Sequence, residues 1–106
     1  MGLLVAVGGL PGVGKTTVST QITDRLDAVR LRTDVLRKEL FDTPTYSATE
    51  TQTVYQMLYD RTGKHLAADR PVVLDATFRR QSQRDRLATL AETHQAAFQF
   101  VHVDCD

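Results

Sequence analysis

The sequence contains only one cysteine, and it has no excess of positive or negative charge. Its single cysteine, Cys105, excludes an internal disulfide framework and a zinc site built from cysteines, so we expect a reducing, cytoplasmic setting. Thirteen Lys and Arg residues balance thirteen Asp and Glu residues, which leaves no overall basic field to hold a polyanion. Long nucleic acid is therefore not the expected partner.

Long hydrophobic runs are also missing. The longest apolar stretch, residues 3–10, is far shorter than the ~20 residues of a membrane-spanning helix. No basic segment precedes it and no cleavage-type site follows it, so the pattern of a signal peptide is not met. Ala6 stands where an N-myristoylation motif needs Ser or Thr. We therefore expect no membrane contact.

The composition that remains is that of an ordinary globular domain. With 106 residues, 42% of them hydrophobic and 25% charged, the chain has room for one domain with a small core, and we expect residues 1–106 to form it. Ten of the thirteen basic residues are Arg, whose planar guanidinium matches phosphate and carboxylate groups. Local contacts with an anionic ligand thus remain open.

Hydrophobic spacing predicts strands that alternate with helices. Short apolar or alternating segments at residues 3–7, 29–31, 72–74 and 98–103 are typical of strands. Between these segments, apolar residues recur at helical spacing in four places: after the glycines near residue 14, around residues 36–40, over 50–68 and over 87–94. Residues 43–49 are predicted to form a loop. This alternation implies parallel pairing and an α/β layered fold.

The segment that carries chemistry is "GGLPGVGKTT", residues 8–17. It fits the P-loop, or Walker A, pattern G-x-x-x-x-G-K-[ST] and lies between a predicted strand and a predicted helix. Glycines and a helix N-terminus supply inward-facing N–H groups for phosphate, Lys15 would reach the β- and γ-phosphates, and the Thr16 hydroxyl would bind Mg²⁺. The alternative is a flexible loop with a solvated lysine. The expected nucleotide-binding residues are Gly9, Gly12, Val13, Gly14, Lys15, Thr16 and Thr17.

The third predicted strand favours phosphate transfer over hydrolysis. It ends in Asp75, which is placed to bind Mg²⁺ directly or through water. Many hydrolytic ATPases follow this aspartate with a glutamate that orients water, but here Ala76 follows. The sequence also contains no N-K-x-D segment for guanine. A bound hydroxyl acceptor is therefore favoured over water.

An acceptor hydroxyl needs a carboxylate to accept its proton, and Asp34 is the candidate. It stands at the end of the second predicted strand, which shares an edge of the sheet with the P-loop, although it also suits an N-cap of the next helix. Arg37, one turn later, either binds an anionic acceptor or lies on a solvated helix face. Tyr46 lies in the predicted loop, where a stacking role for a base or ring stays open.

The segments "GLPGVGKTT", "TDVLRKEL" and "VVLDATF", in this order, resemble P-loop kinases that include polynucleotide 5′-hydroxyl kinases. They resemble more closely the AAA-family ATP-binding domains, with gluconate kinases, adenylylsulfate kinases and zeta toxins as wider relatives. The resemblance implies a three-layer core with strand order 2-3-1-4. It assigns Asp34 as general base, Arg37 as anion-binding residue and Asp75 as metal ligand.

The same resemblance implies a basic residue at the start of the fourth helix, and Arg84 matches it best. Arg79 and Arg80 either meet phosphate or are solvated, and Thr77 would position the acceptor. Such kinases continue beyond the fourth strand into an arginine-bearing lid and an adenine-binding segment, whereas this sequence stops at Asp106. The sequence is then a piece of a longer chain, or a fused or partner domain supplies the lid, or catalysis is weak.

The sequence thus predicts a kinase that binds ATP and Mg²⁺ and transfers the γ-phosphate to a hydroxyl of a small-molecule or nucleotide-like acceptor. One alternative is a regulatory module that binds the nucleotide and hydrolyses it slowly without transfer. A more distant one is a zeta-toxin-like kinase that acts on a sugar nucleotide.

Overall fold

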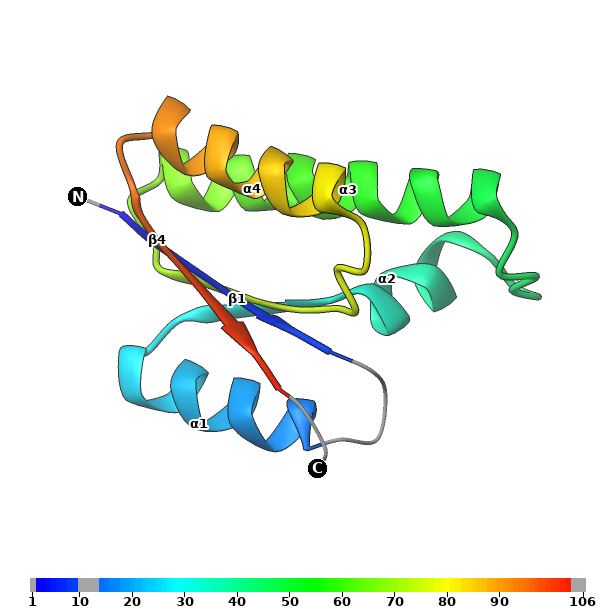
Figure 1. Ribbon diagram of the computed structural model, residues 1–106, viewed down its shortest axis with the longest axis horizontal. Helices are drawn as coiled ribbons and strands as arrows, with labels where there is room; N and C mark the ends of the chain where they lie inside the picture. Colours follow the sequence, from blue (N-terminus) through cyan, green and yellow to red (C-terminus); the bar gives the residue numbers. More distant parts are fainter. Residues whose placement is uncertain (1, 10–13, 104–106) are drawn as a thin grey trace.

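The computed structural model describes residues 2–9 and 14–103, in which strands alternate with helices (Figure 1). The strands are β1 (Leu3–Gly8), β2 (Val29–Arg32), β3 (Val72–Asp75) and β4 (Ala97–His102). The helices are α1 (Lys15–Leu26), α2 (Thr33–Leu40), α3 (Ala48–Ala67) and α4 (Gln81–Thr93). None of the helices in these two ranges is both long and apolar enough to cross a membrane.

The strands form one parallel sheet in the order β2-β3-β1-β4, which confirms the predicted α/β class and strand order. Helix α1 covers one face of the sheet, and α3 and α4 cover the other (Figure 1). Residues of β1 alternate between the two faces: Leu4 packs in the core beneath α3 and α4, and Val5 packs in the core beneath α1. Because both faces are covered, the central strands β1 and β3 are apolar except for Asp75 and Gly8 at their carboxyl ends.

The glycines at the end of β1 are required by the neighbouring strand. A Cβ on Gly8 would lie 2.5 Å from the Phe100 ring, and one on Gly9 would lie 2.4 Å from the Val103 carbonyl oxygen. Gly9 has φ 141°, a conformation that favours glycine, and its N–H donates to the carbonyl of Thr77 at 3.3 Å. Close packing of β1 against β4 thus explains these two positions.

Some boundaries differ from the predicted ones. Helix α3 begins at Ala48 rather than at residue 50, because the Ser47 hydroxyl accepts a hydrogen bond from the Glu50 N–H at 3.1 Å and caps the helix. Asp34 lies in the first turn of α2, since β2 already ends at Arg32. Strand β4 ends at His102, one residue earlier than predicted.

Candidate functional site

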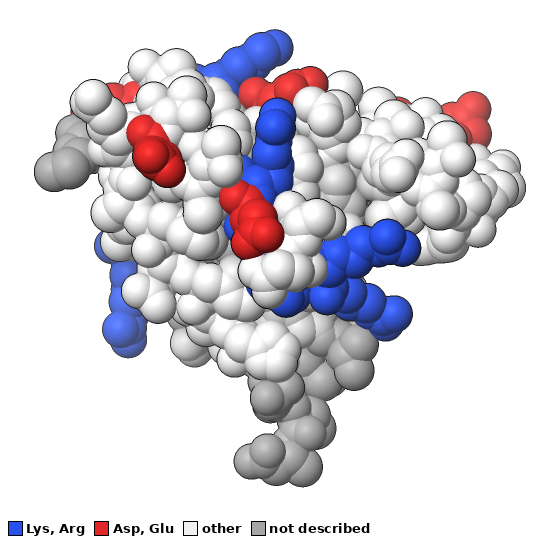
Figure 2. All heavy atoms as spheres, turned by 45° about the horizontal axis from the view of Figure 1, so that its top comes forward, with Lys and Arg blue, Asp and Glu red and all other residues white. Residues whose placement is uncertain are grey.

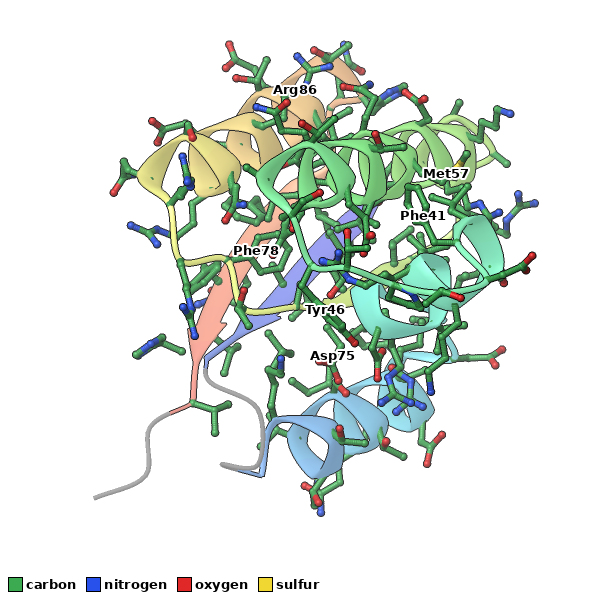
Figure 3. The ribbon with its side chains drawn as sticks, turned by 90° about the vertical axis from the view of Figure 1, so that its right-hand side faces the viewer. Phe41, Tyr46, Met57, Asp75, Phe78 and Arg86 are labelled. Atoms are coloured by element: carbon green, nitrogen blue, oxygen red, sulfur yellow. The ribbon has the colours of Figure 1, made fainter. Side chains whose placement is uncertain are left out.

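A cleft of about 570 Å³ lies at the carboxyl ends of β2 and β3 and at the start of α1. Six of the predicted site residues line it: Gly14, Lys15, Thr16, Asp34, Arg37 and Asp75. Figure 3 looks toward this end of the molecule, where the labelled Tyr46 and Asp75 both belong to the lining. Open parallel sheets bind ligands at this edge.

Lys15 and Asp75 form the buried centre of the cleft. The Lys15 Nζ lies 3.4 Å from the Asp75 Oδ1, and the two side chains are only 10% and 5% exposed. Because Lys15 is buried against a carboxylate, the alternative of a solvated lysine is wrong. The pair thus places one cation and one carboxylate together in the lining of the cleft.

Ser19, which the sequence reasoning missed, completes this cluster. It is fully buried, and its Oγ donates a hydrogen bond to the Asp75 Oδ2 at 2.8 Å. Ser19 follows Lys15 by four residues on α1, so both side chains lie on the same helix face. This spacing was the available signal, but the partner is 56 residues away along the chain.

The start of α1 is open to an anion. Its N-cap, Gly14, has φ 84°, provides no side-chain hydrogen bond, and no acidic residue lies in the first turn. The N-cap residue thus leaves the first N–H groups without a side-chain acceptor, and these groups and the positive end of the helix dipole favour an anionic ligand. Thr16 and Thr17 are exposed in the first turn, but only Thr16 lines the cleft. Two predicted binding residues, Gly12 and Val13, lie outside the described residues.

The oxygen donors of the cleft fit Mg²⁺ held together with a nucleotide. No group of three or more His, Cys, Asp or Glu residues in the described part of the chain is placed to hold a metal alone. Mg²⁺ commonly uses one or two protein oxygens, with phosphate oxygens and water completing its shell. The carboxylate of Asp75 and the hydroxyl of Thr16, both in the lining, are donors of this kind.

Arg37 lies in the wall of the cleft and is buried, so a solvated helix face is wrong for it. Its Nη1 donates to the Glu50 Oε1 at 2.6 Å, and its Nη2 donates to the Thr51 hydroxyl at 3.3 Å. The guanidinium also lies over the Tyr46 ring, with its Cζ 4.6 Å from the ring centroid. Arg37 therefore joins α2, α3 and the loop between them.

Glu50 organises that loop, and the sequence reasoning gave it no role. Its carboxylate is buried and accepts hydrogen bonds from the N–H groups of Thr45 and Tyr46 and from the Thr45 hydroxyl, as well as from Arg37. Burial alone would raise the pKa of Glu50, but these hydrogen bonds together lower it from 4.5 to about 2. Glu50 is therefore ionised at neutral pH.

This shift predicts how stability depends on pH. Because the folded-state pKa of Glu50 lies below its ordinary value, the stability that Glu50 contributes is complete above about pH 4.5 and is lost as the pH falls toward 2. We expect Glu50→Gln to be less stable than the wild type at pH 7 and to lack this part of the acid dependence. Urea denaturation over pH 2–7 measures it, with Glu92→Gln, exposed on α4, as control. Parallel pH profiles for Glu50→Gln and the wild type would contradict the assignment.

Asp34 is exposed at the cleft, with a side chain 61% accessible. Its Oδ1 accepts from the Val35 N–H at 2.9 Å, and its Oδ2 accepts from the Arg32 Nη2 at 3.0 Å. The carboxylate thus stabilises the start of α2 locally while it remains open toward the cleft. The N-cap of α2 is Arg32 and no side chain caps the helix, so the alternative of an N-cap role for Asp34 is wrong, and its role as a base stays a prediction.

The segment after β3 places two of its three arginines at the cleft. Arg79 and Arg80 line it together with Thr77, whereas Arg84 does not. Arg84 instead donates to the carbonyls of Phe78 at 2.6 Å and Arg79 at 3.2 Å, so it fixes the turn that leads into α4. Thr77 lies with its hydroxyl 3.3 Å from the Tyr55 hydroxyl.

The cleft is basic although the whole chain is balanced. Five of its lining residues are basic and two are acidic: Lys15, Arg32, Arg37, Arg79 and Arg80 against Asp34 and Asp75. In Figure 2, acidic and basic side chains are interspersed over the visible face, and several basic side chains gather at one edge. The excess of basic over acidic residues in the cleft lining favours an anionic ligand there.

Comparison with solved structures shows the same fold in P-loop kinases. The APS kinase CysC of Mycobacterium tuberculosis matches with a TM-score of 0.82 and 21% identity, over 97% of this chain and 76% of that one. A candidate kinase of Chloroflexus aurantiacus matches with a TM-score of 0.80 and 23% identity, over 95% of this chain and 58% of that one. A chain of the Pnkp1/Rnl/Hen1 complex matches with a TM-score of 0.80 and 22% identity, over 97% of this chain and 35% of that one.

The fold is therefore the one that these kinases share. The chain belongs to the AAA domain family, whose sequence profile matches residues 4–106. None of the curated proteins has a sequence similar enough to match it. The chain spans just over half of the Chloroflexus protein and about a third of the chain in the Pnkp1 complex.

Proposed function

We propose that this domain binds ATP with Mg²⁺ in the cleft and transfers the γ-phosphate to a hydroxyl of a small-molecule or nucleotide-like acceptor. The observation that carries the proposal is the buried Lys15–Asp75 pair beside the uncapped N-terminus of α1. ATP phosphates would replace Asp75 as the partner of Lys15, which frees the Asp75 carboxylate and the Thr16 hydroxyl to hold Mg²⁺. The APS kinase CysC of M. tuberculosis, solved with AMPPNP and APS, has this fold.

Mg²⁺ held by Asp75 and Thr16 would supply positive charge beside the phosphates, and the protein would position the reacting groups. Asp34, exposed in the lining of the cleft, would accept the proton of the acceptor hydroxyl as its oxygen bonds to the γ-phosphorus. The bond from the γ-phosphorus to the bridging oxygen of the β-phosphate would break, and ADP would leave. Ala76 is 1% exposed in the core, so the residue after Asp75 offers no carboxylate to orient water. Both features favour an acceptor hydroxyl over water.

Tyr46 would bound the acceptor site on the side away from the phosphates. Its ring is 70% exposed, lines the cleft and is supported from behind by Arg37. An exposed ring held in this way suits stacking on a base or sugar ring of the acceptor. A lid and an adenine-binding segment would come from further chain or from a partner domain, since the relatives extend well beyond the matched region.

The test is an incubation with γ-labelled ATP and Mg²⁺ against a panel of sugars, nucleosides, aminoglycosides and 5′-hydroxyl oligonucleotides. The proposal predicts label in one or more acceptors, at a rate that depends on the acceptor concentration. Label found only as free phosphate would support the alternative of a regulatory module that hydrolyses ATP slowly. Label confined to sugar nucleotides added to the panel would support a zeta-toxin-like kinase.

A further inference from the structure

Two arginines lie next to Asp34 in the cleft wall, and they differ in how much of their guanidinium is free. Arg37 projects from α2, and Arg32 is the last residue of β2. The side chain of Arg37 is 10% exposed and that of Arg32 is 28% exposed. The difference bears on which of them can bind a charged group of the acceptor.

Arg37 already forms an ion pair with Glu50. Glu50 contacts it at 2.6 Å from within the protein, Thr51 accepts a second hydrogen bond, and the Tyr46 ring covers one face of the guanidinium. An anion that took the place of Glu50 would displace a buried carboxylate that also accepts from the loop N–H groups of Thr45 and Tyr46. Leaving that carboxylate buried without its cation is strongly unfavourable.

Arg32 has donors to spare. Its Nη2 pairs with the Asp34 Oδ2 at 3.0 Å, and that carboxylate is mostly exposed, so the pair is weak and easily exchanged. Its Nε is the only buried side-chain nitrogen or oxygen in the described residues that lacks a hydrogen-bond partner. A guanidinium carries five N–H donors in a planar fork suited to an oxyanion.

The position of Arg32 along β2 brings it to the cleft. Arg30 lies two residues earlier on the same strand, and its Nη1 bonds to the Thr20 hydroxyl on α1. Arg30 does not line the cleft, whereas Arg32, at the carboxyl end of the strand, does. Arg30 and Arg32 are therefore two arginines of the same strand, of which only Arg32 lines the cleft.

We propose that Arg32 is the specificity-determining residue that binds an oxyanion of the acceptor, a carboxylate or a phosphate close to the reacting hydroxyl, and that Arg37 positions Tyr46 and the loop. This inference rests on the proposed phosphate transfer. It departs from the role that family resemblance assigns to Arg37. The oxyanion would bind the exposed part of the guanidinium in place of Asp34, whose carboxylate would then turn to the hydroxyl.

The test compares acceptors that differ only in the anion: gluconate with glucose, and adenosine 3′-phosphate with adenosine. Transfer of label from ATP is measured for the wild type, Arg32→Gln, Arg32→Lys and Arg37→Gln, with Arg30→Gln as the matched control. Whichever pair the wild type uses identifies the oxyanion as carboxylate or phosphate. The readout is the ratio of kcat/KM for the anionic member to that for the neutral member.

We expect Arg32→Gln to lower this ratio by about 10- to 100-fold, mainly through a higher KM, because a charge-assisted hydrogen bond is lost in the ground state and the transition state alike. Arg32→Lys should restore part of the ratio, and Arg30→Gln should leave it unchanged. Arg37→Gln should affect both members alike.

An unchanged ratio in Arg32→Gln would overturn the inference, as would a ratio lost in Arg37→Gln but kept in Arg32→Gln. If Arg37→Gln does not fold, the Arg32 and Arg30 variants decide alone. Free phosphate as the only labelled product of the wild type would overturn the proposed function itself, together with this inference.

Discussion

Lys15→Ala is expected to lose ATP-dependent turnover by about 100-fold or more, since one preorganised cation on a transferring phosphoryl group is typically worth that much. The side chain is buried in the cleft, with its Nζ 3.4 Å from the Asp75 Oδ1. ATP affinity measured by calorimetry, together with turnover of labelled ATP, checks the expectation. Lys64→Ala, exposed on α3, serves as the matched control.

Folding has to be separated from binding in this experiment. Removing Lys15 leaves the buried Asp75 with Ser19 as its described hydrogen-bond donor, so Lys15→Gln, which keeps a polar group of similar length, is made in parallel. Circular dichroism and thermal unfolding establish which variants are folded. A folded variant with wild-type affinity and turnover would remove Lys15 from the site.

Asp34→Asn is expected to bind ATP as the wild type does and to lose phosphate transfer by about 100- to 10,000-fold, the usual contribution of a general base. The amide keeps the oxygen that accepts from the Val35 N–H, so the start of α2 should stay intact. Steady-state transfer to the best acceptor of the panel measures the loss. Asp24→Asn, exposed on α1, is the control. Equal transfer rates in Asp34→Asn and the wild type would reject the role of base.

Most of the fold follows from local sequence. The unbroken apolar residues of β1 and β3 predict strands covered on both faces, and the structure buries them on both. The strand order followed from resemblance, because periodicity contains no information about which strands are neighbours. The capped start of α3 was predicted two residues late, since Ser47 forms its cap through the backbone of Glu50.

The site was predictable where its residues belong to the P-loop motif or lie at the end of a predicted strand, as Asp34 and Asp75 do. Lys15 and Thr16 stand in the P-loop pattern, and both line the cleft. The bond from Ser19 to Asp75 joins residues 56 positions apart, and the pair of Arg37 and Glu50 joins residues 13 apart across a loop. No spacing in the sequence indicates such contacts, because sheet order and helix packing create them.

The place of Arg32 in the cleft could likewise not be predicted from local sequence. Alternation in "VRLR" predicts a half-exposed strand, and all four residues of β2 are half-buried. Alternation places Arg30 and Arg32 on the same face, yet only the carboxyl end of the strand meets the cleft. Parallel pairing of β2 with β3 decides this, with Arg32 opposite Asp75 in the register. A charged residue at the end of a predicted parallel strand is thus a better site candidate than one in its middle.

The most direct test of the central claim is the fate of the γ-phosphate in a single turnover. Protein in excess over labelled ATP, with Mg²⁺ and a saturating concentration of the best acceptor, is quenched at successive times, and the label is divided between acceptor and free phosphate. We predict that most of the label enters the acceptor in the wild type and that Asp34→Asn slows this transfer. A wild-type protein that releases all of its label as free phosphate, at a rate unaffected by any acceptor, would contradict the account.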